Sequence, residues 1–386
     1  MTKLRRLEWS AVRARRLRRH HLLNRAPASS LLEVIRDTCG IHAQVQSAAE
    51  LAIAMRVDGL RREDVRAELW EARRLIRMTT LRGTIHLHPV EDAPLWLAAT
   101  RAGADSAGEA RRLAYLGLSN QQMEAMVEGI REALDGRSLT LRELGEDLAE
   151  RVGSWVMEGD SNAFGGSWPH YRSAIYRAAW AGAVCFGPDR GREVVHVRPD
   201  QWVPGWTAVE PDQALVEALR RFLRAFGPAT RQDFARWLAI TPAAARRAVE
   251  VARDELEEVE LEGERRFELL SAEPAEGDPA SVRLLPHFDQ YLLGSHPRRL
   301  VFEAWVAHGL VVAGGGNVPV LAIDGLAAGL WRRTSRGRRA EVTVQCFAPL
   351  GRAQLRELKA EVERIERFSG IETSLVLGDV EARPHM

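Results

Sequence analysis

Three helices followed by two short strands are expected three times in succession before residue 275 of this 386-residue chain. In the first copy the helix-like and strand-like runs lie at 30–40, 47–55, 62–72, 75–80 and 84–88. Three helices and a hairpin are the plan of a winged helix, whose second and third helices form a helix-turn-helix. Such modules usually bind DNA, although they also serve as contacts between proteins.

Turn and cap signals place the other two copies. In the second copy the expected elements lie at 121–134, from Thr140 onward, and at 169–182, 184–186 and 193–197. In the third copy they lie at 213–226, from Thr230 onward, and at 243–255, 257–261 and 266–270. The segments Ser30–Glu33 and Thr140–Glu143 have the spacing of a capping box, and Thr241-Pro242 has the pattern of a helix start.

The pattern changes after the acidic linker at residues 271–280. Strand-like runs follow at 281–286, 318–323, 326–331, 341–347 and 373–378, and one helix is expected at 352–368. These strands predict a small antiparallel barrel or a strongly curled sheet. The expected fold class is therefore α+β, with three tandem winged-helix domains followed by a small C-terminal antiparallel β-barrel. The expected domain bounds are 1–110, 111–205, 206–275 and 280–386.

Composition narrows the classes of protein to which the chain can belong. With 46% hydrophobic and 28% charged residues, it is typical of soluble, globular proteins. No apolar run approaches the roughly 20 residues that cross a bilayer, and no apolar region follows the basic first residues as in a signal peptide. The three cysteines, Cys39, Cys185 and Cys346, are too scattered for a disulfide framework or a zinc site. We therefore expect a monomeric cytoplasmic protein with no metal, no cofactor and no membrane partner.

Charge is distributed unevenly, although the net charge is only +1. Residues 1–25 hold nine basic residues and one acidic residue, whereas residues 250–279 hold twelve acidic and three basic residues. Almost all of the positive charge is arginine, because Lys3 and Lys359 are the only lysines. An arginine excess can reflect a GC-rich genome. It also suits a polyanionic partner, since the guanidinium group binds phosphate through a rigid fork of donors.

Two basic loops are candidate DNA contacts. Residues 332–339 place five arginines at one expected hairpin tip, where phosphate contacts would release counterions. The loop at 295–299 is stiffened by proline and suits entry into a minor groove. Either loop can instead be a solvated turn. The candidate DNA-binding residues are Arg332, Arg333, Arg336, Arg338, His296, Pro297, Arg298 and Arg299.

The tripeptide Gln44-Val45-Gln46 is the candidate catalytic motif. It places two amide side chains two residues apart, just after an amphipathic helix. Neutral amides do not take up a proton as a carboxylate does, but they can hold a water molecule or a polarised substrate. The chain shows no P-loop, no GxSxG elbow and no CxxC pair. ATP hydrolysis, acyl transfer of the α/β-hydrolase kind and zinc chemistry are therefore unsupported.

Four segments, together with the tandem winged helices, resemble the AlkZ-like bacterial DNA glycosylases across nearly the whole chain. These segments are Ile41–Gln46, Leu81–Leu87, Leu284–Gly294 and Val320–Trp331. The resemblance implies three winged helices and a C-terminal β-barrel arranged around duplex DNA. It also implies excision of N7-alkylated purines, including bases joined in interstrand crosslinks.

The resemblance implies roles for individual residues as well. The family motif is Gln, an apolar residue, then Gln or Asp, so Gln44 and Gln46 are expected to be catalytic in the Gln form. The residues expected to neighbour this site are His42, Arg82, Thr84 and His86. His86 and His88 alternate on a strand and are expected to share a face. The family also probes DNA with a hairpin from the barrel, and we place that hairpin at 295–299.

The chemistry fits these residues. Alkylation at N7 makes guanine cationic and a good leaving group, so its glycosidic bond needs little acid assistance. Two amides can hold a water molecule below C1′ and support the developing oxocarbenium by positioning rather than by proton transfer. Because the two lysines lie in peripheral stretches, we expect no Schiff base and a monofunctional enzyme that leaves an abasic site.

The alternative is a non-catalytic winged-helix DNA-binding regulator, in which Gln44 and Gln46 are simply a polar helix start. The glutamine motif joined to a barrel favours the enzyme, because a regulator needs neither. The expected partner is double-stranded DNA with alkylated purines, with no nucleotide cofactor. The protein would then be associated with the nucleoid when it is on DNA.

Overall fold

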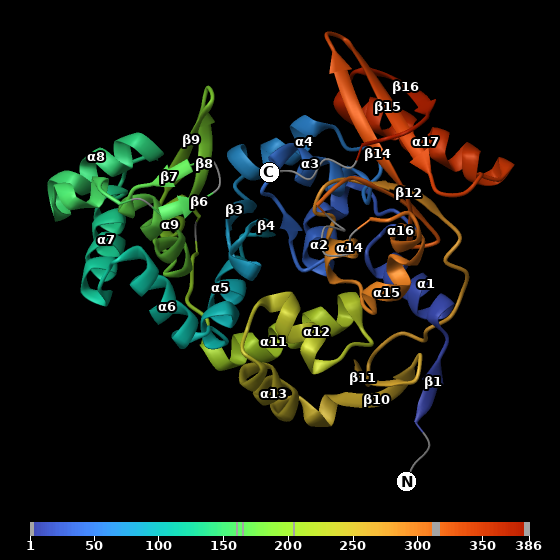
Figure 1. Ribbon diagram of the computed structural model, residues 1–386, viewed down its shortest axis with the longest axis horizontal. Coiled ribbons are helices and arrows are strands. Elements are labelled where there is room, and N and C mark those ends of the chain that lie inside the picture. Colours follow the sequence, from blue (N-terminus) through green and yellow to red (C-terminus); the bar gives the residue numbers. More distant parts are fainter. Residues whose placement is uncertain (1–3, 160, 164–165, 204, 311–316, 382–386) are drawn as a thin grey trace. The chain divides into compact units, whose positions relative to one another are not determined.

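The computed structural model describes residues 4–159, 161–163, 166–203, 205–310 and 317–381 (Figure 1). They form two compact units. Unit 1 contains the described parts of Met1–Arg66, Leu219–Trp237 and Val249–His385, and unit 2 contains those of Ala67–Ala218 and Leu238–Ala248. Each unit is therefore assembled from segments that lie far apart in the sequence.

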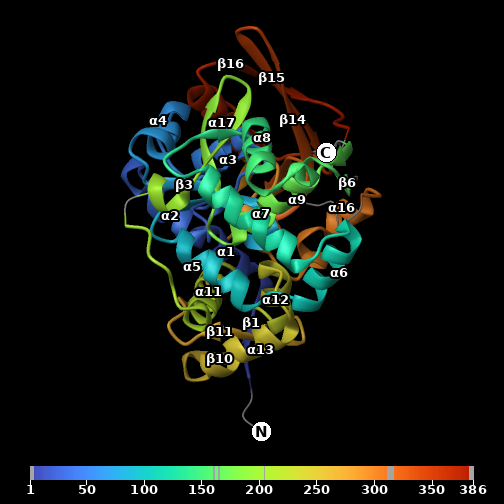
Figure 2. The same cartoon turned by 90° about the vertical axis from the view of Figure 1, so that its left-hand side faces the viewer.

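Unit 2 combines a small sheet with helices. Its strands β4, β3, β8, β9 and β5 lie in this order in one sheet, while β6 and β7 form a separate antiparallel pair. Three of its helices, α7, α8 and α9, are grouped together (Figure 2). They contribute Met126, Leu144 and Ala174 to one hydrophobic core. The helices and strands of unit 2 are β3 (Leu75–Thr79), β4 (Ile85–Pro89), α5 (Ala93–Ala102), α6 (Ser106–Leu116), α7 (Asn120–Ala133), β5 (Leu139–Thr140), α8 (Leu141–Val152), β6 (Ser161–Ala163), β7 (Gly166–Trp168), α9 (His170–Trp180), β8 (Cys185–Arg190), β9 (Glu193–Val197) and α10 (Pro199–Trp202).

Unit 1 begins with short helices and receives a hairpin from later in the chain. Its first elements are β1 (Arg5–Leu7), α1 (Trp9–Arg19), α2 (Leu31–Asp37), β2 (Ile41–His42), α3 (Gln46–Ala54) and α4 (Arg62–Arg66). The chain returns through α11 (Pro211–Phe226) and α12 (Arg231–Leu238), of which residues 219–226 and 231–237 belong to unit 1. It continues through α13 (Pro242–Val251), which lies mostly in unit 2, to β10 (Leu256–Leu261) and β11 (Glu264–Leu269) of unit 1. β1 pairs in parallel with β10, which pairs antiparallel with β11.

The C-terminal part of unit 1 is an open, half-barrel sheet in the order β12-β13-β14-β15-β16. Among the described residues the two edge strands do not pair with each other, so the expected barrel is present only as a half-barrel that does not close. The last pair, β15 and β16, is also parallel rather than antiparallel. The elements are β12 (Val282–Leu285), α14 (Gln290–Gly294), α15 (Arg298–Val301), α16 (Glu303–Ala307), β13 (Val320–Ile323), β14 (Leu326–Arg336), β15 (Arg339–Cys346), α17 (Arg352–Ser369) and β16 (Glu372–Leu377).

The helix α17 explains both departures from the expected barrel. It connects β15 to β16, and a helical crossover is what lets two successive strands pair in parallel. Its residues Leu358, Val362 and Ile365 also belong to the apolar core on one face of the sheet. Because the helix buries that face, the sheet does not need to close on itself to remove apolar surface from water.

Alternation along the strands divides the apolar residues of this sheet between two cores. Leu330 and Val320 belong to the core that contains Leu17 and Phe302, whereas the neighbouring Trp331 and Leu321 belong to the core beneath α17. Successive residues of a strand point to opposite faces. The continuous apolar runs of β13 and β14 therefore reflect a sheet that is buried on both faces.

Most helices and strands predicted from the sequence are present within a few residues of their expected bounds, and the α+β class is confirmed. Thr140 and Glu143 form the expected capping box, whereas Ser30 ends a short 3₁₀ turn and makes no side-chain cap. The helix expected at 62–72 is α-helical to Arg66 and continues as a π-helical turn over Ala67–Glu71. The grouping of these elements into three winged-helix domains, with the bounds given above, stays a prediction.

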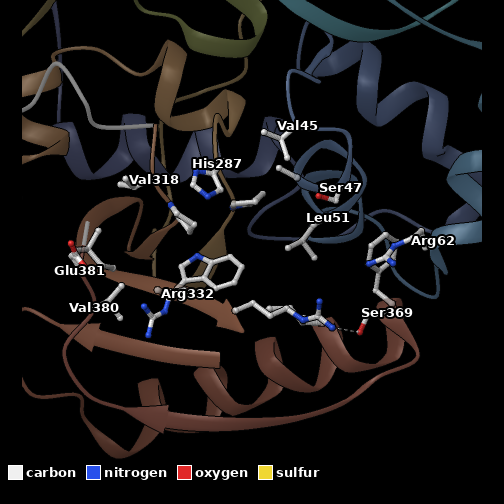
Figure 3. Close-up of a pocket in the computed structure, with 18 residues that line it drawn as sticks. Val45, Ser47, Leu51, Arg62, His287, Val318, Arg332, Ser369, Val380 and Glu381 are labelled. Atoms are coloured by element: carbon white, nitrogen blue, oxygen red, sulfur yellow. Dashed lines mark hydrogen bonds between the residues drawn. The ribbon is translucent and has the colours of Figure 1, made fainter. Parts of the chain in front are cut away.

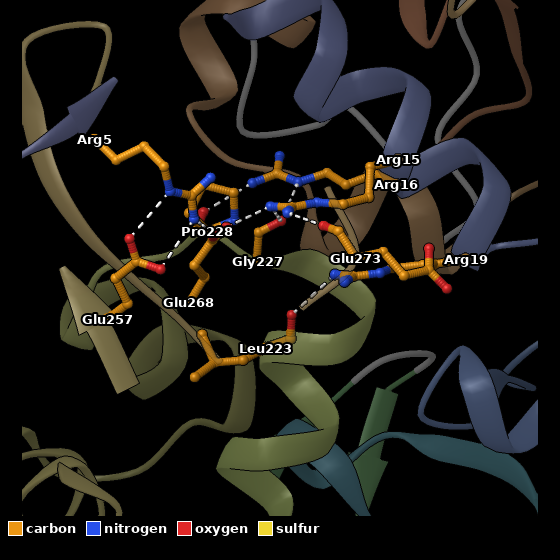
Figure 4. Close-up of polar contacts among 10 residues, drawn as sticks. All are labelled: Arg5, Arg15, Arg16, Arg19, Leu223, Gly227, Pro228, Glu257, Glu268 and Glu273. Atoms are coloured by element: carbon orange, nitrogen blue, oxygen red, sulfur yellow. Dashed lines mark hydrogen bonds and ion pairs between the residues drawn. The ribbon is translucent and has the colours of Figure 1, made fainter. Parts of the chain in front are cut away.

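The basic N-terminal segment is largely used inside unit 1. Arg15 and Arg16 of α1 are fully buried, and Arg15 forms an ion pair with Glu268 at 2.6 Å (Figure 4). Arg16 donates to the carbonyl of Pro228 at 3.0 Å, and burial lowers its pKa to about 9. Arg5 pairs with Glu257 at 3.0 Å. The excess of arginine at the start of the chain therefore partly complements the acidic segment at 250–279, rather than an external polyanion.

The described residues contain neither a membrane-spanning helix nor a cluster of metal ligands. No helix there is long and apolar enough to span a bilayer. Within the same ranges, His, Cys, Asp and Glu side chains do not gather in groups of three that could hold a metal ion.

Candidate active site

The Gln44-Val45-Gln46 motif lies at the junction between β2 and α3 of unit 1. Gln44 is exposed in the connecting loop, Val45 is the extended residue before the helix, and Gln46 is the first residue of α3. The buried ring of His42 stacks on Phe288 with 4.4 Å between ring centroids. Its Nδ1 accepts from the backbone N–H of Gln44 at 3.5 Å. His42 thus supports the loop that carries Gln44.

The side chain of Gln46 is held by a buried carboxylate one helical turn away. Its Nε2 donates to Glu50 Oε1 at 3.1 Å, and Glu50 is 1% exposed. Residues four apart face each other on a helix, which explains why this contact forms within α3. An amide whose NH₂ group donates to a carboxylate directs its carbonyl oxygen away from that carboxylate. Gln46 is therefore oriented as an acceptor, suited to a water O–H.

Two arginines of α4 neutralise the buried Glu50. Arg66 donates from Nε to Glu50 Oε1 at 2.8 Å, and Arg62 Nε lies 3.4 Å from Oε2. A buried carboxylate is costly unless it is paired and hydrogen-bonded, so these contacts fix its position. Sequence reasoning missed Glu50, Arg62 and Arg66. The spacing of four residues from Gln46 to Glu50, and again from Arg62 to Arg66, was the signal that could have found them.

The other three predicted neighbours belong to unit 2. Arg82 Nη2 donates to His86 Nε2 at 3.2 Å, and the His86 ring is fully buried. His86 Nδ1 lies 3.0 Å from the Thr84 carbonyl, so that nitrogen carries the proton and Nε2 accepts. Burial lowers the pKa of the Arg82 guanidinium to about 10. His86 also stacks on His88 at 5.8 Å, which confirms that the two histidines share a face.

The turn between β3 and β4 that carries Arg82 and Thr84 depends on Gly83. Gly83 has φ of +67°, and a Cβ there would lie 1.9 Å from Tyr176 Oη. Gly83→Ala is expected to destabilise the protein by about 2–4 kcal/mol, because it adds a clash to left-handed strain. Chemical denaturation would measure this loss. Gly117→Ala is the matched control, since Gly117 has φ of +66° but open space around it. Equal losses at both glycines would contradict the proposed packing.

A pocket of about 350 Å³ opens beside the glutamine motif, entirely within unit 1. Val45 and Ser47, the neighbours of Gln46 in the chain, line one side together with Leu51 (Figure 3). The opposite side is formed by β14, which contributes Arg332 to the lining, and by α17, which contributes Ser369. Trp331 lies in the lining and donates from Nε1 to the Leu285 carbonyl at 2.8 Å. The pocket is therefore mainly apolar, with arginines at its edge.

The five arginines expected at one hairpin tip are separated in the structure. Arg332 and Arg333 pair with Thr343 and Val342 within the β14–β15 ladder, and both line the pocket. The turn itself joins Arg336 to Arg339 and carries the exposed Arg338. The side chain of Arg336 lies outside the described part of the chain. The prediction of a single basic tip is therefore wrong, because β14 extends five residues beyond its apolar part.

The basic loop at 295–299 is mostly used by the fold. His296 faces Asp233 with 3.3 Å between Nδ1 and Oδ1, and burial lowers the pKa of this histidine to about 4. Pro297 is buried, and Arg298 donates to the Leu292 carbonyl at 2.9 Å. Arg299 is exposed. The predicted DNA contacts of this loop stay predictions, and Arg299 is the member whose side chain is available for one.

Comparison with known proteins places the chain in a family. A family model described as "DNA glycosylase AlkZ-like" matches residues 35–368. The chain is 31% identical over 377 residues to the "Interstrand DNA cross-link repair glycosylase" of Streptomyces sahachiroi, covering 94% of this chain and 97% of that protein. The solved structure of the DNA glycosylase AlkZ from Streptomyces sahachiroi matches with a TM-score of 0.81 at 28% identity, covering 97% of this chain and 100% of that chain.

These matches define the class of protein as a DNA glycosylase. The chain belongs to the AlkZ-like DNA glycosylase family. The family resemblance noted in the sequence is thereby confirmed. The roles of Gln44, Gln46 and their neighbours stay predictions, for which the geometry above supplies the physical argument.

Proposed function

We propose that this protein hydrolyses the N-glycosidic bond of cationic N7-alkylated purines in duplex DNA, including purines joined in interstrand crosslinks, and leaves an abasic site. The observation that carries the proposal is the fixed Gln46 amide beside the exposed Gln44. Gln46 donates its NH₂ group to the buried Glu50 at 3.1 Å, which fixes its carbonyl oxygen on the side away from that carboxylate. The AlkZ relative, named for cross-link repair, supports the inclusion of crosslinks.

The chemistry follows from the charge of the substrate. As the C1′–N9 bond breaks, its electron pair neutralises the cationic purine, which leaves without protonation. A water molecule that donates one O–H to Gln46 directs its oxygen lone pair toward C1′ and forms the new bond. Its second proton passes to solvent. The amides supply position and dipole rather than a strong base, and positioning alone can remove a large part of a barrier.

The proposal predicts selectivity for cationic lesions and a monofunctional reaction. A neutral purine needs a stronger general acid than an amide provides. A lyase step needs an amine nucleophile, and the chain contains only Lys3 and Lys359. We place the protein on DNA in the cytoplasm, and we retain three winged helices as the DNA-binding modules.

A base-release assay tests this function. A duplex with one N7-methylguanine is incubated with excess protein and then treated with mild alkali, which cleaves abasic sites. Strand cleavage after alkali, and none before it, is the expected result, together with no covalent adduct under borohydride. A borohydride-trapped adduct would overturn the monofunctional assignment. If neither the methylated nor a crosslinked duplex releases a base, while undamaged DNA binds tightly, the protein acts as a DNA-binding regulator instead.

A further inference from the structure

The pocket beside the glutamine motif is lined by more arginines than carboxylates. Among the described lining residues are three arginines, Arg62, Arg332 and Arg333, and one carboxylate, that of the exposed Glu381. Arg62 shares Glu50 with Arg66, so one carboxylate serves two guanidinium groups. Negative charge inside the pocket is therefore insufficient to balance its arginines.

Arg333 is the half-buried arginine of this set that has no carboxylate partner among the described residues. It lies half-buried on β14, and its polar contact there is with a neutral group, from Nη2 to Ser369 Oγ at 3.3 Å. Its Nε is buried without a hydrogen-bond partner among the described residues. Burial lowers its pKa, and the positive charge of Arg62 lowers it further. A guanidinium group held next to another cation in an apolar setting is arranged for an anion.

The charge of the pocket decides which part of the substrate it can take. A cationic alkylpurine would be repelled by Arg62 and Arg333. A neutral aromatic group would leave Arg333 Nε unpaired in an apolar setting, which is costly. A phosphate group is negatively charged, so the arginines attract it. Its oxygens also accept several charge-assisted hydrogen bonds, including one from Arg333 Nε. The anion that reaches a site next to Gln46 in an enzyme of this family is a phosphodiester of DNA.

We propose that this pocket binds one phosphodiester of the DNA strand on which Gln44 and Gln46 act, with Arg333 as the main contact and Arg62 as the second cation. This proposal rests on the proposed function, since it concerns the same strand. Val45 and Ser47 line the pocket and flank Gln46, so the bound phosphate fixes the sugar of a nearby nucleotide relative to the amide. Phosphate contacts set the register of a protein on DNA without reading the base.

The salt dependence of DNA binding tests the contact directly. Arg333→Gln removes the charge but keeps a polar side chain that can donate a hydrogen bond. At fixed salt the affinity for an undamaged duplex is expected to fall roughly tenfold, and the slope of log K against log salt to decrease by about 0.9, as for one lost phosphate contact. Arg333→Lys is expected to restore the slope. Arg367→Gln is the matched control, because Arg367 is 64% exposed on α17 and paired with Glu363.

A second arm locates the phosphate and separates DNA from free phosphate. Single methylphosphonate linkages, which are neutral, are placed along the lesion strand. The wild type is expected to lose affinity at one linkage, at which Arg333→Gln shows no further loss. Inorganic phosphate at millimolar concentration is expected to leave this pattern unchanged. Equal slopes for the wild type and Arg333→Gln, or a loss no larger than that of Arg367→Gln, would overturn the proposal.

The outcome is distinguishable from a failure of the proposed function. Binding to undamaged DNA needs no base release, so an Arg333-dependent slope without any base release would retain the phosphate site and reject the glycosidic chemistry. Base release with no effect of Arg333 on the salt slope would retain the glycosidic chemistry and reject the phosphate site. Thermal melting of each variant checks that it is folded, and Arg333→Lys keeps the test valid if Arg333→Gln is unstable.

Discussion

Gln46→Ala is expected to lower the single-turnover rate of N7-methylguanine release by about 100- to 1,000-fold, as when one transition-state hydrogen-bonding group is removed. The reason is that the alanine side chain has no carbonyl oxygen that could orient the attacking water. Affinity for duplex DNA should change little, because the amide is one short side chain at the start of α3. The rate is measured with protein in excess over a labelled duplex, and the dissociation constant is measured by fluorescence anisotropy.

Gln213→Ala is the control for this substitution. Gln213 is likewise a glutamine in the first turn of a helix, α11, but it is exposed, and its loss should leave the rate unchanged. A Gln46→Ala protein that releases N7-methylguanine at the rate of the wild type would remove Gln46 from the mechanism. A loss of DNA affinity as large as the loss of rate would assign Gln46 to binding instead.

Glu50 is expected to act through Gln46 as a positioning residue. Glu50→Gln keeps an oxygen that accepts from Gln46 Nε2, so it should retain most of the activity. Glu50→Ala removes that acceptor and should lower the rate without changing the affinity for DNA. A purely structural role would instead lower the melting temperature and the activity together in both variants. Rescue by the conservative variant thus separates orientation of the amide from simple support of the fold.

Local patterns in the sequence predicted the structure correctly in most places where the deciding contact is between residues close together in the chain. The capping box of Thr140 and Glu143 formed as its spacing predicts. The segment Ser30–Glu33 has the same spacing, yet Ser30 belongs to a 3₁₀ turn, so its side chain is not placed to cap. The alternation of His86 and His88 correctly placed both rings on one face.

Long-range contacts were the part that the sequence could not supply. Nothing in β16 indicates whether it pairs parallel or antiparallel with β15, because strand direction depends on the path of α17. Arg333 and its neighbours in β14 are polar, so the strand seemed to end at Trp331, although backbone pairing continues to Arg336. Arg15 and Arg16 resemble surface residues until the carbonyls and carboxylates that bury them are known.

The second large effect is expected at a buried ion pair that holds the segment next to the motif. Arg56 donates to both carboxylate oxygens of Asp289, at 2.8 and 2.7 Å, and both side chains are fully buried. Asp289 follows Phe288, on which His42 stacks. Asp289→Ala is expected to lower the free energy of unfolding by about 3–5 kcal/mol, because it leaves the Arg56 charge buried without its carboxylate. Chemical denaturation measures this loss.

An exposed pair and a double substitution show what the buried pair contributes. Glu146→Ala breaks the exposed contact with Arg142, at 2.8 Å, and should change the free energy of unfolding far less than Asp289→Ala, because solvent screens the pair. Arg56→Met with Asp289→Leu removes both buried charges and should recover much of the stability lost in Asp289→Ala. If that double variant is stable but releases N7-methylguanine slowly, the pair serves to orient Phe288 and the His42 ring that contacts the Gln44 backbone. If the double variant is as unstable as Asp289→Ala, the pair itself stabilises unit 1.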